Sequence, residues 1–445
     1  MVSAIDADYV VIGAGAMGMA FIDEILTHSD ATVAVIDRHA KPGGHWNDAY
    51  PFVRLHQPSF FYGVGSAQLG SGRIDDVGLN RGLSELASGA EVCAYYDHIM
   101  QRRYLPSGRV EYLPSAVYRD GEATITPAGV TVAVTARRAV VDATYMKVKV
   151  PSTSPPGYAV DPDARVIAPN LLPVADRPAD GYTIIGAGKT AFDAILWLLA
   201  NHVDPAEIRW IAPRDSWMIN RAIIQPGDGF RIGDQTALIA EAGGAHDVFE
   251  RLESEGHFLR VDPRIEPTMY RCATITEAEL HELRRIDHVV RGSRVAAVGP
   301  TAIELDDGEI PTSAETLHVD CTADGLERLP IRPVFDDGLL TLQTVRACQQ
   351  VFSAALIARI ETLEETDQAT KNELATVIPH PDTPDDFLTG SLAHLHNMGR
   401  WMAQPDIARW LTESRLSPTG GTAPDLAVAI QAVENLTRFT AEVDG

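Results

Sequence analysis

The chain has 445 residues, of which 45% are hydrophobic and 22% charged, as is typical of a globular protein with two or three domains. Its 61 Asp and Glu residues outnumber its 37 Lys and Arg residues and give a formal net charge of -24. This acidity argues against nucleic acid or an anionic membrane as a partner, because both require a basic surface.

The first residues lead almost directly into a strand-like run and lack the basic segment and apolar core of a signal peptide. The longest apolar stretch, around 191–199, is shorter than the roughly 18–20 residues that span a bilayer. Both features predict a cytoplasmic protein without a membrane partner.

Four cysteines are scattered along the chain with no close pair: Cys93, Cys272, Cys321 and Cys348. This spacing favours a reducing compartment such as the cytoplasm. It also lacks the Cys-x-x-Cys or Cys-x4-Cys pair that thioredoxin-reductase or lipoamide-dehydrogenase chemistry requires. The sequence therefore predicts no redox-active disulfide.

One supersecondary unit occurs twice. An apolar run at 9–12 leads into a glycine turn at 13–18, a helical pattern and a second apolar run at 32–36. The same order returns over 182–212. Both segments are typical of βαβ units in a parallel sheet.

The remaining patterns are weaker. Apolar and polar residues largely alternate over 123–134, which predicts a small antiparallel insertion. Residues 223–285 are mixed and mostly helical in pattern, and a third strand-like run covers 316–319. The last hundred or so residues are predicted to be mainly helical.

The first glycine turn has the G-x-G-x-x-G spacing of a dinucleotide site. Gly13 permits the tight turn, Gly15 lets the backbone approach a pyrophosphate, and Gly18 lets the helix pack closely on the strand. Phosphates would then lie at the positive end of the helix. Asp37 ends the second strand, where an acid can accept hydrogen bonds from ribose hydroxyls. The alternative is an ordinary glycine-rich turn of a βα unit.

The second turn begins with Gly186 and Gly188 and has alanine in the third glycine position, which the motif tolerates. Lys189 and Thr190 follow, so a Walker A loop is a rival interpretation. That loop needs a glycine where Thr183 stands, inside the strand, and an ATPase is therefore disfavoured. A lysine in the first helical turn opposes the helix dipole unless an anion is near, which favours a phosphate contact.

The second strand of this unit ends in Ala212-Pro213-Arg214 instead of an acid. A cation at this place suits the 2′-phosphate of NADP, whereas an acid would suit NAD. We therefore expect NADP, with a solvated loop role for Arg214 as the alternative.

Directly after the first unit comes Gly43-Gly44-His45-Trp46. It resembles the Gly-Gly-x-Trp segment of the flavin-containing monooxygenase group, which includes Baeyer–Villiger monooxygenases and ornithine N-hydroxylases. The following residues, Tyr50 to Gln57, resemble the segment of that group that approaches the flavin ring. The resemblance implies FAD at the first site, with Gly44 and Trp46 along it and Asp37-Arg38 at its nucleotide end.

Two strand ends add to the resemblance. Residues 141–145 and 319–325 are similar to the Ala-Thr-Gly-type turns that flank the cofactors in this group. By this likeness Thr144 and Asp324 contact cofactor, and Arg214 reads the 2′-phosphate. The resemblance covers roughly residues 8–60, 140–220 and 315–360.

The chain departs from the group at one point. The fingerprint Phe-x-Gly-x3-His-x3-Trp should precede the second glycine turn, but residues 155–174 contain neither His nor Trp. This departure leaves open whether oxygen is inserted into a substrate or only electrons are transferred.

The resemblance implies that NADPH reduces the flavin and that O2 then forms a C4a-(hydro)peroxide, which oxygenates a small molecule. N-hydroxylation, sulfoxidation and Baeyer–Villiger insertion all fit. The cofactor carries this chemistry, so no acid–base triad and no metal site are expected.

The polar candidates for the reaction are few. His56 and Gln57 are the candidates beside the flavin, although a lone histidine is often structural. Arg54 can face flavin or substrate charge, with a surface ion pair as the alternative. Asn220 is the candidate beside the nicotinamide.

The expected fold is α/β with two Rossmann-like dinucleotide-binding domains, the NADP domain being inserted in a discontinuous FAD domain. The FAD domain comprises 1–155 and 313–365, and the NADP domain 156–312 with a helical insertion at 223–285. The helical region 366–445 and this insertion would cover the active site.

The expected partners are a small-molecule substrate and O2, and the oligomeric state stays open between a monomer and a homodimer. A flavin reductase or dehydrogenase without oxygen insertion is the second hypothesis. A non-catalytic dinucleotide sensor is the third.

Overall fold

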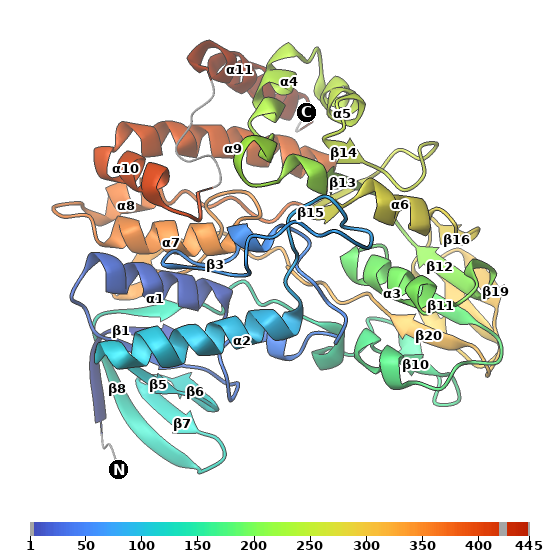
Figure 1. Ribbon diagram of the computed structural model, residues 1–445, viewed down its shortest axis with the longest axis horizontal. Coiled ribbons are helices and arrows are strands. Elements are labelled where there is room, and N and C mark those ends of the chain that lie inside the picture. The colour runs from blue at the N-terminus through green and yellow to red at the C-terminus, as the bar shows by residue number, and fades with distance from the viewer. Residues whose placement is uncertain (1–3, 418–424, 444–445) are drawn as a thin grey trace.

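The computed structural model describes residues 4–417 and 425–443. Two parallel sheets lie at opposite sides of the molecule (Figure 1). The first has the order β22 (Leu339–Thr341), β8 (Val130–Asp142), β1 (Ala4–Ile12), β2 (Val33–Ile36), β5 (Val110–Leu113). Its central strands are continuous apolar runs such as Val33–Ile36, buried on both faces, as parallel strands require.

Helix α1 (Ala16–His28) connects β1 to β2, as the first predicted βαβ unit requires. It packs against α7 (Gln350–Glu361), a helix that is buried along almost its whole length. Helix α2 (Gly89–Ile99) lies nearby above the same sheet (Figure 1). These helices and the sheet share one hydrophobic core.

The predicted antiparallel insertion is present. Strands β6 (Ala116–Arg119) and β7 (Glu122–Ile125) pair antiparallel with each other, and β7 pairs with the first half of β8. Ala123, Val132 and Val134 are buried between exposed neighbours, which accounts for the alternation in the sequence.

The second sheet is parallel throughout and has the order β10 (Val166–Ile167), β20 (Leu317–Asp320), β11 (Tyr182–Ile185), β12 (Ile208–Ala212), β16 (His288–Arg291). Helix α3 (Lys189–Ala200) connects β11 to β12, so the second βαβ unit is also confirmed.

The strand predicted at 316–319 exists as β20. It was expected in the second part of the FAD domain, 313–365, but it pairs with β11 in the second sheet. The return to the first sheet is made by β22 and by β21 (Phe335–Asp336). Either sheet could bury an apolar four-residue strand, so local pattern could not assign it.

The segment 223–285 was expected to be mostly helical, and this prediction is only half right. It contains α4 (Asp234–Glu241), α5 (Ala245–Ser254) and α6 (Glu277–Leu283). It also contributes β14 (Phe258–Leu259) and β15 (Met269–Ile275), which pair with β13 (Ser216–Asn220). These strands are stabilised by packing against distant aromatic residues, such as Phe387, which a local pattern does not reveal.

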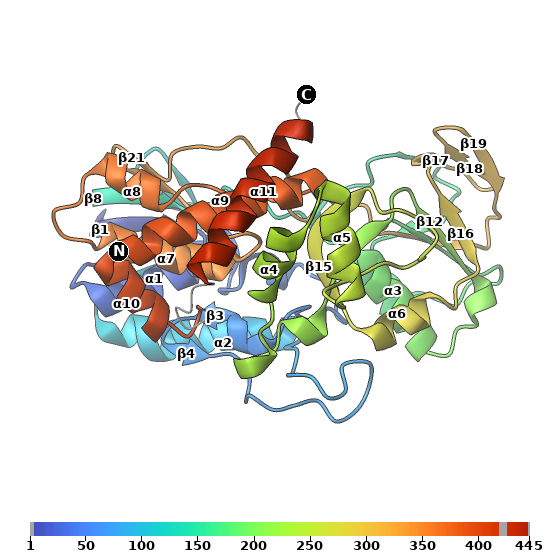
Figure 2. The ribbon, with the colours of Figure 1, turned by 90° about the horizontal axis from the view of Figure 1, so that it is seen from above.

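The chain beyond α7 is helical, as its pattern predicts. It forms α8 (Gln368–Leu374), α9 (Pro384–Ala403), α10 (Pro405–Glu413) and α11 (Leu426–Val443). Figure 2 shows α11 lying across α9 and beside α4, and a shared core joins these helices to the small sheet of β13, β14 and β15.

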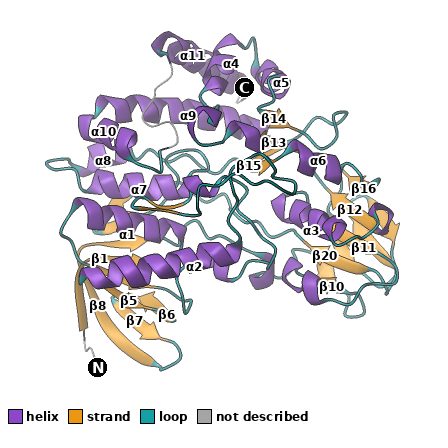
Figure 3. Ribbon diagram, in the orientation of Figure 1, coloured by secondary structure: helices purple, strands orange, loops and turns teal. Residues whose placement is uncertain are grey.

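The smaller strands are β3 (Gly63–Val64), β4 (Ala67–Gln68), β9 (Ala159–Val160), β17 (Val295–Val298), β18 (Ala302–Leu305) and β19 (Gly308–Pro311). Figure 3 shows that mostly loop segments connect the two large sheets. None of the helices within residues 4–417 and 425–443 is long and apolar enough to cross a membrane.

Candidate active site

The strands of each large sheet end level with one another. In the first sheet, Ile12 at the end of β1 pairs with Ile36 and Asp142. In the second sheet, Ile185 at the end of β11 pairs with Asp320. Ligands of open α/β sheets bind beyond these carboxyl ends. The two edges therefore define the candidate site.

One segment connects the two edges. The hydroxyl of Tyr50, shortly after the Gly43-Gly44-His45-Trp46 segment, donates a 2.7 Å hydrogen bond to Asp193 on α3. The ring of Phe52 stacks on Trp197 of the same helix, with the ring centroids 5.4 Å apart. The edges of the first and second sheets are thereby brought to a common region.

The first glycine turn is packed as its spacing predicts. A Cβ on Gly18 would overlap the carbonyl oxygen of Gly13, so helix and strand approach as closely as only glycine allows. Gly13 has φ +101°, and a Cβ there would lie 2.9 Å from Thr144. Thr144 donates two hydrogen bonds to Asp142, from its backbone and its hydroxyl, which hold the turn after β8 against Gly13.

The Gly43-Gly44 pair packs on this turn. The Gly43 N–H donates to the carbonyl of Ala14 at 2.9 Å, and a Cβ on Gly44 would lie 2.9 Å from the Cα of Gly15. Trp46 follows and its indole N–H donates to the hydroxyl of Tyr62 at 2.8 Å. Gly44 therefore packs directly on the first turn, and Tyr62 holds the indole of Trp46.

Asp37 is buried and its carboxylate is held by protein groups. It accepts hydrogen bonds from the N–H groups of Ala14, at 2.5 Å, and His39, at 2.7 Å. The ring of His39 also lies 3.1 Å from Asp37 and 2.8 Å from Asp48. The hydrogen bond to Asp37 raises the pKa of His39 above its usual value. Arg38 is exposed at the same rim.

Sequence reasoning missed His39, because a histidine just after a strand end has no motif of its own. The role of His39 is apparent only from the fold, which brings Asp48 to 2.8 Å from its Nε2.

The second glycine turn repeats the first. Gly186 has φ +133°, and a Cβ there would lie 2.6 Å from the carbonyl oxygen of Cys321. Thr322 donates to Asp320 from its backbone, at 3.2 Å, and its hydroxyl, at 2.6 Å, as Thr144 does in the first sheet. Gly188 begins α3 and has open space where a Cβ would project.

Both turns fit the phosphates of a dinucleotide. Helices α1 and α3 begin at Gly15 and Gly188, with no side-chain cap and no acidic residue in the first turn. By contrast, α2, α6 and α9 begin with Ser or Thr in a capping box. The first N–H groups of α1 and α3 are therefore left for an acceptor outside the helix, such as a phosphate.

Lys189 and Thr190 lie in the first turn of α3. The Lys189 ammonium forms an ion pair with Asp193, four residues on, which also accepts from Tyr50. The Asp193 carboxylate therefore compensates the positive charge of Lys189, the charge from which a phosphate contact was predicted. The i,i+4 spacing of Lys189 and Asp193 is the sequence signal for this ion pair.

Arg214 is engaged by a distant carboxylate. Its two terminal nitrogens each lie 2.9 Å from Asp382, which Arg271 also contacts at 2.8 Å. Arg271 in turn lies 2.8 Å from Asp324 in the loop after β20. Arg214 and Asp324 thus belong to one ionic network. A 2′-phosphate at Arg214 would compete with Asp382, a residue 168 positions away that the sequence could not place there.

His56 is enclosed between the two edges. Its Nδ1 accepts the Thr274 N–H at 3.2 Å, and its carbonyl accepts from Arg221 at 2.9 Å. Burial, aided by Lys189 and Arg221, lowers the pKa of His56 to about 3. The ring is therefore neutral at physiological pH and donates from Nε2. Gln57, its neighbour, is partly exposed.

Two predicted residues have structural roles instead. Asn220 donates to the carbonyl of Gly256 at 2.9 Å and accepts from the Ala222 N–H at 3.1 Å, so its amide caps a turn. Arg54 is exposed and donates to the carbonyl of Leu86 at 3.0 Å. Backbone partners, which have no sequence signal, satisfy both side chains.

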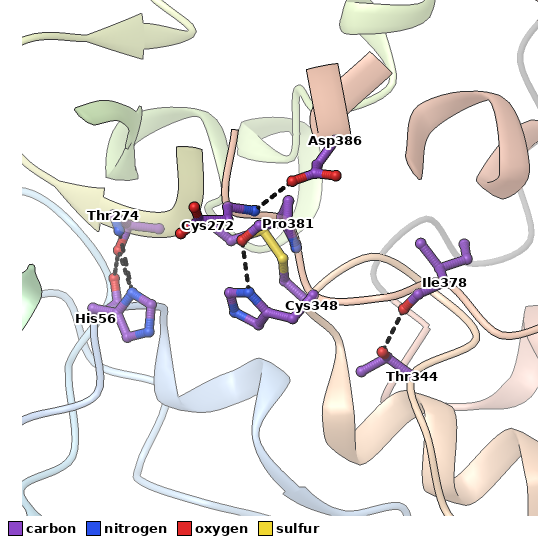
Figure 4. The surroundings of a disulfide bond; sticks show 10 residues. His56, Cys272, Thr274, Thr344, Cys348, Ile378, Pro381 and Asp386 are labelled. Atoms are coloured by element: carbon purple, nitrogen blue, oxygen red, sulfur yellow. Dashed lines mark hydrogen bonds between the residues drawn. A yellow bond between two sulfur atoms is a disulfide. The ribbon is translucent and has the colours of Figure 1, made fainter. Parts of the chain in front are cut away.

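The spacing of the cysteines predicted a reducing compartment and no redox-active disulfide, but the structure contains one disulfide. Cys272 on β15 and Cys348 before α7, 76 residues apart, form a disulfide. Figure 4 shows His56 and Thr274 on one side of this bond and Thr344 on the other. Cys93 and Cys321 are free thiols. The spacing rules for redox cysteines apply to pairs on one local element and miss a pair assembled from two.

No protein-family model matches the chain. Among solved structures, the polycyclic ketone monooxygenase from the fungus Thermothelomyces thermophila aligns with 99% of this chain and 89% of its own, with a TM-score of 0.51 and 13% identity. An oxidized steroid monooxygenase bound to NADP aligns with 99% of this chain and 98% of its own, with a TM-score of 0.50 and 14% identity. The chain therefore has the mixed α/β fold of flavin monooxygenases.

Two mycobacterial proteins are far more similar in sequence. Uncharacterized protein Rv2000 of Mycobacterium tuberculosis is 49% identical over 429 residues, which cover 95% of this chain and 80% of the relative. Uncharacterized protein Mb2023 of Mycobacterium bovis has the same identity and coverage. The chain thus belongs to the protein family of Rv2000 and Mb2023, built on the fold of the flavin monooxygenases.

Proposed function

We propose that the chain is an oxidoreductase that binds FAD at the first glycine turn and NADPH at the second. The proposal rests on two matching glycine turns, which we call the first and second cradle. In each cradle a helix without a side-chain cap follows a glycine, and an Asp-x-Thr turn packs on the first glycine of the motif. In this proposal the two sheets are the cores of two Rossmann-like domains, with the NADP domain inserted in a discontinuous FAD domain.

Each cradle has its own proposed contacts. Gly13, Gly15, Gly18, Asp37, Arg38, Gly44, Trp46 and Thr144 would hold FAD, with Gln57 at the flavin end. Gly186, Gly188, Lys189, Thr190 and Arg214 would hold NADPH. For Lys189 and Arg214 this requires a phosphate to displace Asp193 and Asp382 as the ionic partner.

When bound, the two groups supply hydride transfer from nicotinamide to flavin. The chain brings them together, because the segment from Tyr50 to His56 links the first cradle to α3. The neutral His56 carries its proton on Nε2 and adds no charge to this region. Burial of the surrounding side chains excludes water from the same place.

The proposed acceptor of the electron pair is O2, with oxygen transferred to a small-molecule substrate. The shared fold with a ketone and a steroid monooxygenase supports this assignment. One observation favours the second candidate, a reductase without oxygen insertion: Cys272 on β15 and Cys348 before α7 form a disulfide, and His56 lies on one side of it (Figure 4).

Two glycine variants test the cofactor assignment. Gly15→Val should abolish FAD binding, since its side chain would project against the Gly44 backbone, about where the pyrophosphate passes. Gly188→Val has open space for its side chain, so the variant should fold and retain FAD. Dithionite should still bleach its flavin, while NADPH should reduce it at least about 100-fold more slowly than in the wild type.

The measurement is anaerobic stopped-flow absorbance of the flavin, with NADH compared with NADPH, and then reoxidation by O2. Wild-type protein that carries no flavin, or flavin that NADPH does not bleach, would leave only a dinucleotide sensor. Reoxidation that releases one H2O2 per flavin with every candidate substrate would exclude oxygen insertion and favour the reductase.

A further inference from the structure

The disulfide between Cys272 and Cys348 joins the small sheet of β13, β14 and β15 to the chain that leaves the first large sheet. β22 runs parallel to β8, so the chain after Thr341 leaves the first sheet at the edge of its glycine turn. Cys348 lies on this chain, just before α7. On the other side, Arg271 beside Cys272 contacts Asp324 in the loop after β20. The bond thus joins the segment that follows the first sheet to strand β15, whose Arg271 contacts the loop after β20.

The backbone at both cysteines is unusual. Cys272 has φ +54° and Cys348 has φ +58°, in the left-handed region that few non-glycine residues occupy. Cys272 also lies in a β-bulge. Trp217 and Ile219 on β13 pair with Tyr270 and Thr274 on β15, so β15 has two extra residues between these pairs. Bulges and such backbone conformations concentrate next to functional sites, where they re-aim a side chain.

The two sulfurs differ in accessibility. Cys272 is 8% exposed, whereas Cys348 is partly exposed. Cys348 also precedes the N-terminal end of α7, which has no side-chain cap and no acidic residue in its first turn. The positive end of the helix favours a thiolate at Cys348. Cys348 is therefore the sulfur suited to exchange, with Cys272 as its buried partner.

A buried histidine is held between the two cysteine-bearing segments. The Ile378 N–H donates to the carbonyl of Thr344 at 2.8 Å, and the Tyr270 N–H donates to the carbonyl of Asp382 at 3.0 Å. His380 lies between these anchors, and its Nδ1 donates to the next carbonyl at 2.9 Å. Its Nε2 is thereby left as a proton acceptor.

A cavity of about 20 Å³ lies beside this histidine. His380 and Thr344 line one part of it, and Tyr145, which directly follows Thr144, lines another. The volume is enough for one water molecule. One water molecule can therefore lie beside His380 and exchange protons with its ring.

We infer that Cys272 and Cys348 are a redox couple that accepts the electron pair of NADPH by way of the flavin and passes it to a small disulfide substrate at Cys348. This inference rests on the proposed electron flow from NADPH to FAD. It gives that electron pair a protein-borne acceptor, which sequence spacing had excluded.

The reaction balances without a further reagent. NADPH and one proton convert the disulfide to two thiols: the S–S bond breaks, one S–H bond forms at each sulfur, and NADP+ is released. The second proton comes from solvent, with His380 as the shuttle. The Cys348 thiolate then attacks the substrate disulfide, and Cys272 closes the ring and releases two substrate thiols.

Anaerobic NADPH titration of the flavin-loaded protein tests the couple. We expect the wild type to consume about two equivalents of NADPH per FAD, because flavin and disulfide each take one electron pair. Alkylation followed by peptide mass spectrometry should then label Cys272 and Cys348, which are protected before NADPH is added. Cys348→Ser should consume about one equivalent, and the control Cys93→Ser, which alters a free thiol, about two.

The wild-type measurement does not depend on whether a variant folds. Flavin that bleaches with one equivalent while Cys272 and Cys348 stay protected would overturn the inference and leave the proposed function intact. Flavin that NADPH does not bleach would overturn both.

Discussion

At the scale of single residues, His39 connects the two carboxylates at the rim of the first cradle. Its protonated ring donates from both nitrogens, to Asp37 and to Asp48, and these contacts raise its pKa. The stabilisation from a raised histidine pKa is fully present below the unfolded-state value near 6.5 and is lost as pH rises through the folded-state value.

We therefore expect the free energy of unfolding of the wild type to fall above pH 6.5, and His39→Gln to remove most of that fall. At pH 6 the variant should lose about 1–3 kcal/mol, as for hydrogen bonds to charged groups. Urea unfolding across pH 6 to 9 measures both. His246→Gln is the matched control, because His246 is exposed, and an equal effect there would refute the role of His39.

At the scale of the element, α1 approaches β1 only because position 18 has no side chain. A Cβ at Gly18 would overlap the Gly13 carbonyl, which is backbone and cannot move aside. Gly18→Ala should therefore cost about 1–3 kcal/mol and open the cradle, with loss of bound flavin. Thermal unfolding and flavin fluorescence of the same samples measure the two effects.

A helical glycine elsewhere provides the control. Gly399 in α9 is exposed and has nothing within 4 Å of a built Cβ, so Gly399→Ala should stabilise the protein by about 0.5–1 kcal/mol. If Gly18→Ala behaved in the same way, close packing would not explain the third glycine.

At the scale of the whole molecule, one fully buried guanidinium joins three separate segments. Arg221 donates to the carbonyl of His56, to Asn80 at 3.1 Å, and to Glu279 on α6 at 2.9 Å. It thereby joins the segment that contains His56, the loop that contains Asn80, and helix α6. The loop lies below α4 in Figure 2. Removing the Arg221 guanidinium leaves the buried Glu279 carboxylate without its ionic partner.

Arg221→Met should cost about 3–5 kcal/mol, and the double variant Arg221→Met/Glu279→Leu should cost less than Arg221→Met alone. Arg231→Met is the control, because that arginine forms an exposed pair with Asp234 and should cost under about 1 kcal/mol. Urea unfolding measures all three, and additive costs in the double variant would contradict a buried pair.

The parts that could be predicted are those in which the chemistry lies within a few consecutive residues. Both strand–turn–helix units, the close packing at Gly18 and the antiparallel hairpin around Pro127 follow from local spacing and alternation. Arg214, Lys189 and Asn220 were assigned to ligands from their local positions: after a strand end, in a first helical turn and after the NADP-type segment. Their partners are Asp382, backbone groups and Asp193.

The sequence by itself determined that two helices begin at glycine turns behind buried parallel strands, because periodicity and glycine spacing act over short distances. Only the tertiary structure decided that β20 joins the second sheet and that segment 223–285 supplies strands to a separate small sheet. It alone brought Cys272 to Cys348 and Arg214 to Asp382. Those pairings depend on how whole sheets and helices bury their faces against one another, and no local pattern of residues encodes that choice.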